Sequence, residues 1–140
     1  MAVERVFPPL EAGERQMLSA WLDLQRATLE MKCDGLSDEQ LREQAVPPSS
    51  LSLLGLVRHM SDTERGWVRQ TFRGERIPDL YYRPDAPDAD FAEADPAGAE
   101  EDFEHYWAEC RAVDAALEGA KLDDTFMFAE KTTSVRWMWQ

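Results

Sequence analysis

His59 is the side chain of this sequence whose type and position point most directly to chemistry. It lies at the edge of the apolar stripe of a helix that we expect between about residues 52 and 74. The residues on the same side of that helix are small and leave space near the imidazole: Ser52, Gly55, Thr63 and Gly66. An imidazole at the edge of a core must be hydrogen-bonded, and it is also a common metal ligand. Spacing alone favours a hydrogen-bonded structural histidine, because a zinc or nickel site needs three or four ligands and no second histidine is placed to reach this one.

The other candidate groups have simpler interpretations. His105 lies opposite the apolar face of its expected helix, among glutamates, and is predicted to be solvated. Residues 85 to 109 hold ten carboxylates and no Lys or Arg, but they lack the spacing of a calcium loop, which favours a solvated acidic surface. Cys33 is expected near a helix C-terminus, where the helix dipole disfavours a thiolate. Cys110 falls in an apolar stripe and is predicted to be a core residue.

Three long amphipathic helices are expected to position these groups. They span about residues 11–35, from Ser50 or Ser52 to residue 74, and 97–117. A short helix begins at Ser37, which forms a capping box with Gln40. The polar face of the second long helix is predicted to form surface ion pairs among its own residues: Arg58, Asp62, Arg65 and Arg69.

Two further segments complete the expected organisation. Residues 75 to 96 contain four prolines and three aromatic residues. This composition predicts a long irregular connection that packs across the bundle. Ser134 is predicted to cap a final helix that carries Trp137 and Trp139 and that is truncated at Gln140. We expect one domain over residues 1–140, because the length and the hydrophobic content of 44% suffice for one core.

Composition excludes several classes of function. The net charge of −13 disfavours binding to nucleic acid or to anionic membrane surfaces, so we expect neither as a partner. No apolar run approaches the roughly 20 residues of a membrane span, and the first ten residues lack the apolar region of a signal peptide. The two cysteines form no CxxC pair. These features together predict a cytoplasmic protein with reduced thiols.

Three stretches resemble the mycothiol-using branch of the DinB-like (YfiT-type) superfamily: residues 21–29, 32–41 and 45–60. The segment from Pro47 to His59 is the most specific, because it combines a Pro-Pro turn, a serine cap and a histidine in the second long helix. Ser134–Trp137 also resembles the start of the final helix of that family. The resemblance implies an all-α fold, an up-down-down-up four-helix bundle whose long crossover joins the second and third helices.

The resemblance also implies a function and a metal. Members bind a divalent ion, often zinc or nickel, and the matching first ligand here is His59. The other ligands of the family lie on the last helix, as a His or Glu followed four residues later by His, beyond the 140 residues of this sequence. The implied activity is a metal-dependent S-transferase or isomerase that uses a low-molecular-weight thiol of the mycothiol type. Its partners would be that thiol and a small electrophile.

Two other functions stay open at this level. The chain could be a non-catalytic binding or stress protein, which would self-associate as a homodimer through the apolar groove that an incomplete fourth helix leaves. It could also be a hydrolase that uses a metal-bound hydroxide at the same site. Dependence on a thiol would separate the transferase from the hydrolase.

Overall fold

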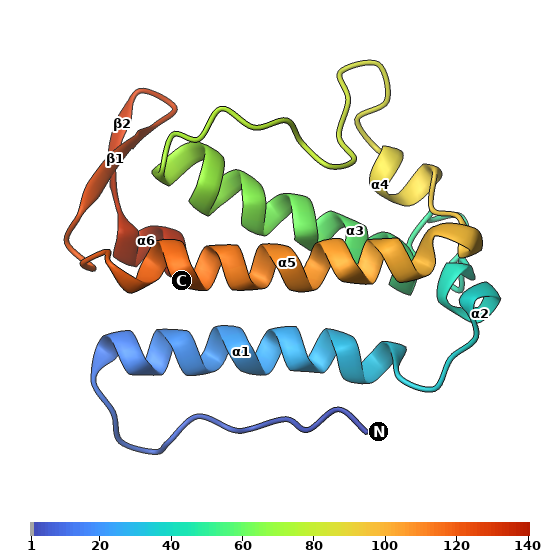
Figure 1. Ribbon diagram of the computed structural model, residues 1–140, viewed down its shortest axis with the longest axis horizontal. Helices are drawn as coiled ribbons and strands as arrows, with labels where there is room; N and C mark the ends of the chain where they lie inside the picture. The colour runs from blue at the N-terminus through green and yellow to red at the C-terminus, as the bar shows by residue number, and fades with distance from the viewer. Residues whose placement is uncertain (1) are drawn as a thin grey trace.

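The computed structural model describes residues 2–140 and is mainly helical (Figure 1). In chain order its helices and strands are α1 (Glu14–Cys33), α2 (Asp38–Arg42), α3 (Leu53–Glu64), the π-helix η1 (Arg65–Phe72), α4 (Ala89–Ala92), the 3-10 helix η2 (Pro96–Gly98), α5 (Ala99–Glu118), β1 (Thr125–Phe128), β2 (Lys131–Ser134) and α6 (Val135–Trp139). None of the helices within this part of the chain combines the length and hydropathy needed to cross a bilayer.

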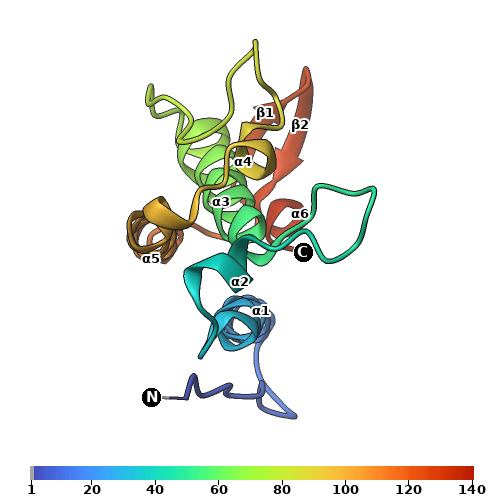
Figure 2. The ribbon, with the colours of Figure 1, turned by 90° about the vertical axis from the view of Figure 1, so that its right-hand side faces the viewer.

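The long helices match the sequence prediction closely. Helix α1 and helix α5 run beside each other along the longest axis of the molecule, and α3 with η1 crosses behind α5 (Figure 1). The view along that axis shows α1, α3 and α5 at three corners of a triangle (Figure 2). The caps predicted at Ser37 and Ser134 are confirmed, and of the two serines predicted for the start of α3 it is Ser52 that forms the cap. The hydroxyls of Ser37, Ser52 and Ser134 each accept a backbone N–H at the start of α2, α3 and α6.

The prediction of a purely helical chain is wrong in one place. Strands β1 and β2 form an antiparallel hairpin in which Thr125 pairs with Ser134 and Phe128 with Lys131. The two turn residues, Ala129 and Glu130, have φ angles of 48° and 63°. Such turns usually carry Asn-Gly, which accepts positive φ at little cost, so Ala-Glu at these positions did not indicate a hairpin.

The core consists of two apolar clusters at opposite ends of α3 and η1. The cluster at the start of α3 joins α2 and the start of α5 through seven buried residues: Cys33, Leu41, Leu54, Val57, Ala94, Ala99 and Tyr106. The second cluster joins η1, the end of α5 and α6 through four: Val68, Val113, Leu117 and Val135. Residues 75 to 96 lie across the outer side of α3, as expected, and include the short helix α4 (Figure 1).

Candidate functional site

His59 lies in the middle of α3, and its ring is held from α4. The imidazole Nδ1 is 2.7 Å from the Oδ2 atom of Asp90, the second residue of α4. The side chain of His59 is 50% exposed, whereas that of Asp90 is 13% exposed. A carboxylate that accepts the Nδ1–H fixes the orientation of the ring and leaves Nε2 as the basic nitrogen. His59 is thus an oriented imidazole that solvent can reach.

A glycine brings α4 close enough to make this contact. A Cβ atom at Gly55 would lie 2.3 Å from a ring carbon of Phe91, so only glycine allows Phe91 to rest on α3 here. The Phe91 ring centroid is 5.5 Å from that of His59. Because Asp90 precedes Phe91, the close approach at Gly55 also sets the position of the carboxylate that holds His59.

Arg58 fixes the backbone of α4 from the adjacent position of α3. Its guanidinium donates to the carbonyl oxygens of Asp90 at 2.7 Å and Ala89 at 2.9 Å. It also lies 3.3 Å from the Asp102 carboxylate and 4.1 Å from the centroid of the Tyr81 ring. These contacts fasten the crossover to α3 and α5 beside His59.

His105 lies in a second polar cluster, and its predicted environment needs a correction. The Tyr81 hydroxyl donates to Asp102 at 2.8 Å and lies 3.2 Å from the Nδ1 atom of His105. His105 is therefore half-buried beneath the crossover, with the Glu101 carboxylate 3.9 Å away. Burial raises the pKa of Asp102, and the hydrogen bond from Tyr81 and the charge of Arg58 oppose this only in part. Burial also raises the pKa of Tyr81, which keeps its hydroxyl a donor.

The prediction that the carboxylates of residues 85–109 form a solvated surface is also wrong for three of them. Asp90, Asp102 and Glu109 are buried. Glu109 accepts from the guanidinium groups of Arg65 and Arg69, the latter at 2.9 Å. The arginines of α3 and η1 therefore pair with the crossover and with α5, and not with Asp62 as their spacing suggested.

An apolar groove runs between α1 and α3, next to His59. It consists of two adjoining hollows of about 330 and 140 Å³ that share Leu22, Met60 and Glu64. Leu56, Met60 and Thr63, the helical neighbours of His59, line its α3 wall.

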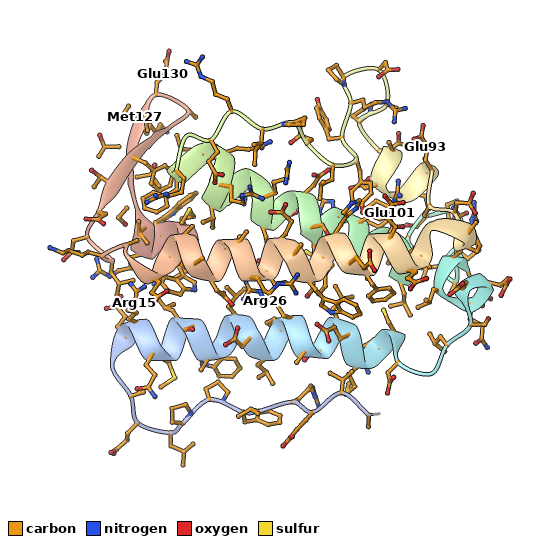
Figure 3. The ribbon with its side chains drawn as sticks, in the orientation of Figure 1. Arg15, Arg26, Glu93, Glu101, Met127 and Glu130 are labelled. Atoms are coloured by element: carbon orange, nitrogen blue, oxygen red, sulfur yellow. The ribbon has the colours of Figure 1, made fainter. Side chains whose placement is uncertain are left out.

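A buried ion pair crosses the base of the groove. The guanidinium of Arg26, which points from α1 toward α5 in Figure 3, donates to both carboxylate oxygens of Glu64, at 2.7 and 2.5 Å. It also donates to Asp114 at 2.7 Å. Burial alone lowers the pKa of Arg26, but Glu64 and Asp114 raise it above its ordinary value. The ion pair joins α1 to α3 and α5, and the spacing within single helices could not have revealed it.

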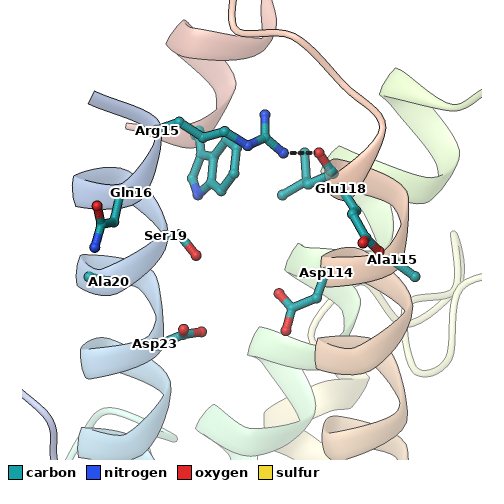
Figure 4. Close-up of a pocket in the computed structure, with 10 residues that line it drawn as sticks. Arg15, Gln16, Ser19, Ala20, Asp23, Asp114, Ala115 and Glu118 are labelled. Carbon is teal, nitrogen blue, oxygen red and sulfur yellow. Dashed lines mark hydrogen bonds between the residues drawn. The ribbon is translucent and has the colours of Figure 1, made fainter. Parts of the chain in front are cut away.

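A larger cleft of about 690 Å³ separates the first turns of α1 from the last turns of α5. Arg15 closes one end by donating to the carbonyl oxygens of Leu117 and Ala120, the latter at 2.5 Å (Figure 4). Asp23 and Asp114 face each other across the cleft, and both are bonded to Arg26.

Both cysteines are free thiols; Cys33 is buried and Cys110 is partly buried. Burial raises the pKa of Cys33 to about 11 and that of Cys110 to about 12, so both are unreactive thiols, as predicted. Within residues 2–140, no three His, Cys, Asp or Glu side chains gather around a point that could hold a metal ion. His59, with its ring held by a carboxylate, has the form of one ligand, but the side chains around it do not complete a metal site.

Comparison with known proteins agrees with the resemblance seen in the sequence. No match to the chain was found among curated proteins or among solved structures. The model of the mycothiol-S-transferase family, a DinB-like family, matches residues 17–140. This match covers the oriented His59, its partner Asp90 and the groove beside them, and the chain belongs to the mycothiol-S-transferase family.

Proposed function

We propose that the protein transfers a low-molecular-weight thiol of the mycothiol type to a small electrophile, or uses that thiol to isomerise it, and that His59 activates the thiol. The observation that carries the proposal is the 2.7 Å contact between His59 and Asp90. A half-exposed imidazole fixed by a carboxylate is an arrangement that activates nucleophiles. The family match supplies the class of thiol.

The chemistry requires a sulfur atom that has lost its proton. The S–H bond breaks, the thiolate sulfur forms a bond to the electrophilic carbon, and the leaving group departs with its electron pair. With Asp90 accepting the Nδ1–H, Nε2 of His59 has a free electron pair that can accept the thiol proton or bind a metal ion. The protein's own thiols do not take part, because Cys33 and Cys110 stay protonated at neutral pH.

A divalent ion is part of the proposal as a ligand of His59. Zinc or nickel, when bound, would lower the pKa of a coordinated thiol and produce the thiolate at neutral pH. Because the described side chains do not complete a site around His59, we assign no step of the reaction to the metal. Asp90 orients the imidazole in either case.

The groove between α1 and α3 is the proposed position of the electrophile. Its walls are mainly apolar, and Leu56, Met60 and Thr63 bring them next to His59. An electrophile with an apolar body would bury that body there and present its reactive carbon at the rim. The two free cysteines support a reducing, cytoplasmic setting for this chemistry.

Two measurements test the role of His59. The first is calorimetric titration of zinc and nickel into the wild type, His59→Ala and, as a matched control, His105→Ala. We expect binding that is lost in His59→Ala and kept in the control. The second is conjugation of mycothiol to 1-chloro-2,4-dinitrobenzene, with and without a chelator. We expect thiol-dependent activity that His59→Ala abolishes.

The outcomes separate the candidate roles. Activity that the chelator abolishes assigns His59 to the metal, whereas activity that resists the chelator but needs His59 makes the imidazole a general base. Hydrolysis without thiol would favour the metal-hydroxide alternative. If His59→Ala changes neither metal binding nor activity, the proposal is wrong and a non-catalytic role is favoured.

Asp90→Asn provides a finer test of the same arrangement. An amide is a weaker acceptor than a carboxylate, so metal affinity or kcat should fall by about 10- to 100-fold while the fold is retained. The effect should appear in kcat and in the pH profile more than in KM. Glu93→Gln, on the exposed side of the same segment, is the control and should leave both unchanged.

A further inference from the structure

A further apolar hollow extends the groove beside His59, and the proposed function does not use it. This hollow, of about 350 Å³, lies between α2, the start of α3 and the connection that joins them. It shares Leu53 and Leu56 with the larger hollow of the groove, so the two meet at these leucines. In Figure 2 the connection between α2 and α3 stands out on the side of α3 opposite α5. We call this space the outer hollow, and the groove together with the outer hollow the α3 trough.

The α3 trough runs along α3, and His59 lies beside its middle. Leu53 and Leu56 line the part near α2, and Met60 lines both hollows of the groove. At a rise of about 1.5 Å per residue, Leu53 and Met60 are about 10 Å apart along the helix axis, and His59 falls between them. A long ligand in the trough would therefore pass the imidazole with apolar walls on both sides of it.

Three apolar side chains around the outer hollow are left exposed by the fold. The exposed fractions are 37% for Leu36, 58% for Val46 and 39% for Leu51. All three line the hollow. A hydrocarbon chain placed among them would remove this surface from water, and the gain is roughly proportional to the apolar area that is buried.

The polar groups of the α3 trough favour an apolar occupant, because most of them are already bonded within the protein. The Ser52 hydroxyl caps α3, and the Gln40 side chain closes the capping box of α2. The Thr28 hydroxyl donates to a carbonyl of its own helix. Arg26 and Glu64 bond to each other. A polar ligand would therefore lose its bonds to water and find few partners on these walls, whereas a hydrocarbon has no such bonds to lose.

We propose that the electrophile is an elongated aliphatic molecule, whose chain lies in the α3 trough and whose reactive carbon lies next to His59. This inference rests on the proposed function and names its class of substrate. Val46 and Leu51 set the length of chain that is accepted, because they line the outer hollow and not the groove. An alk-2-enal has the required form. The thiolate sulfur bonds to its β-carbon, the π electrons of the C=C bond move toward the carbonyl, and the α-carbon takes up the proton that the thiol lost.

Binding of straight-chain alcohols tests the trough without requiring a reaction. In chemical-shift titrations of the full chain with 1-butanol, 1-hexanol and 1-octanol, affinity should rise about two- to fourfold for each added methylene. Val46→Asp and Leu51→Asp place a carboxylate in the outer hollow, and each should weaken the binding of 1-octanol by about tenfold or more. Val6→Asp and Leu10→Asp change the same residue types at exposed positions outside the trough and should leave binding unchanged.

Conjugation of mycothiol to but-2-enal, hex-2-enal and oct-2-enal then connects the trough to His59. In the wild type, kcat/KM should rise with chain length, mainly through a fall in KM, because the added methylenes bind away from the reacting carbon. Leu51→Asp should flatten this rise, and Leu10→Asp should keep it. Circular dichroism checks the fold of each variant, and if Leu51→Asp fails to fold, Val46→Asp decides the result.

The outcomes separate this inference from the proposed function. Equal rates of conjugation for but-2-enal and oct-2-enal overturn the inference and leave the proposed function standing. Binding of the alcohols that does not depend on chain length, or that resists both Val46→Asp and Leu51→Asp, also overturns it. If no electrophile is conjugated to the thiol, the inference falls together with the proposed function. If no alcohol binds and sedimentation gives twice 16.0 kDa, a second copy of the chain fills the trough and the inference is wrong.

Discussion

The two sides of α3 differ in how they meet the rest of the molecule. On the side facing α4 and α5, Arg58 and Arg65 reach carbonyl oxygens and carboxylates of the crossover and of α5. The side facing α1 lines an apolar groove. Its charged contact with α1 is the two-bond ion pair between Arg26 and Glu64, which we call the Arg26–Glu64 fork. The polar face of the helix is covered, and part of the apolar face is open.

This difference reverses a common assumption about amphipathic helices. A polar stripe is taken as the solvated side because charges alone are costly to bury. Here carboxylates and carbonyls from distant segments pair with the arginines, and this pairing offsets the free-energy cost of burying the charged groups. The imidazole of His59 lies at the boundary of the two sides, held by Asp90 from the closed side and next to the open one.

Removing one partner of the Arg26–Glu64 fork should produce the largest effect. Both side chains are at most 9% exposed, so Glu64→Ala leaves a buried guanidinium without its main partner. Such losses cost about 3–5 kcal/mol in the free energy of unfolding, which urea denaturation measures. Glu93→Ala, which breaks the exposed Arg83–Glu93 pair, is the control and should leave the midpoint unchanged. Equal effects of the two changes would contradict the contrast between buried and exposed pairs.

Releasing the crossover from the closed side should have a smaller effect. The Asp62 carboxylate accepts the backbone N–H groups of Leu80, Tyr81 and Tyr82 at 2.7 to 3.0 Å. Asp62→Ala leaves these donors without an acceptor and should cost about 2 kcal/mol. Hydrogen exchange should accelerate at these three amides first, and the amides of α1 should stay protected. Asp62→Asn keeps one acceptor and should fall in between.

Much of the fold was predictable because its information is local. The helix caps at Ser37, Ser52 and Ser134 and the periodic stripes of the long helices depend on residues a few positions apart. The hairpin was missed because Ala129 and Glu130 occupy positions where glycine and asparagine are the usual indicators.

The site was only half predictable for the same reason. The position of His59 at a core edge follows from helical spacing, and the small residues beside it, Gly55 among them, indicated space for the approach of another segment. Its partner Asp90 is 31 positions away, in a segment whose path depends on Arg58, Asp62 and Asp102 acting together. No spacing rule connects such residues, so the sequence identified Asp90 only as one of the carboxylates of the acidic run from 85 to 109.

The smallest effect should come from the thiol beside the fork. Cys110 Sγ lies 3.9 Å from Glu64 Oε1, and burial, followed by the charge of Glu64, raises its pKa to about 12. A thiol whose pKa is raised in the folded state holds its proton there more tightly than in the unfolded chain. Its contribution to stability is therefore complete below the ordinary thiol pKa of about 9.0, and is lost as the pH rises toward 12.

Cys110→Ala should remove this alkaline sensitivity. Between pH 8 and 10 the free energy of unfolding of the wild type should fall by about 1 kcal/mol more than that of Cys110→Ala, as urea denaturation at each pH would show. At pH 8, iodoacetamide should modify the folded wild type far more slowly than the unfolded chain, because burial raises the pKa of both cysteines. Parallel pH profiles for the two proteins, or rapid alkylation of the folded chain, would mean that the groove admits water as far as Cys110. The open side of α3 would then extend to the fork itself, and Glu64→Ala should cost less than a fully buried pair predicts.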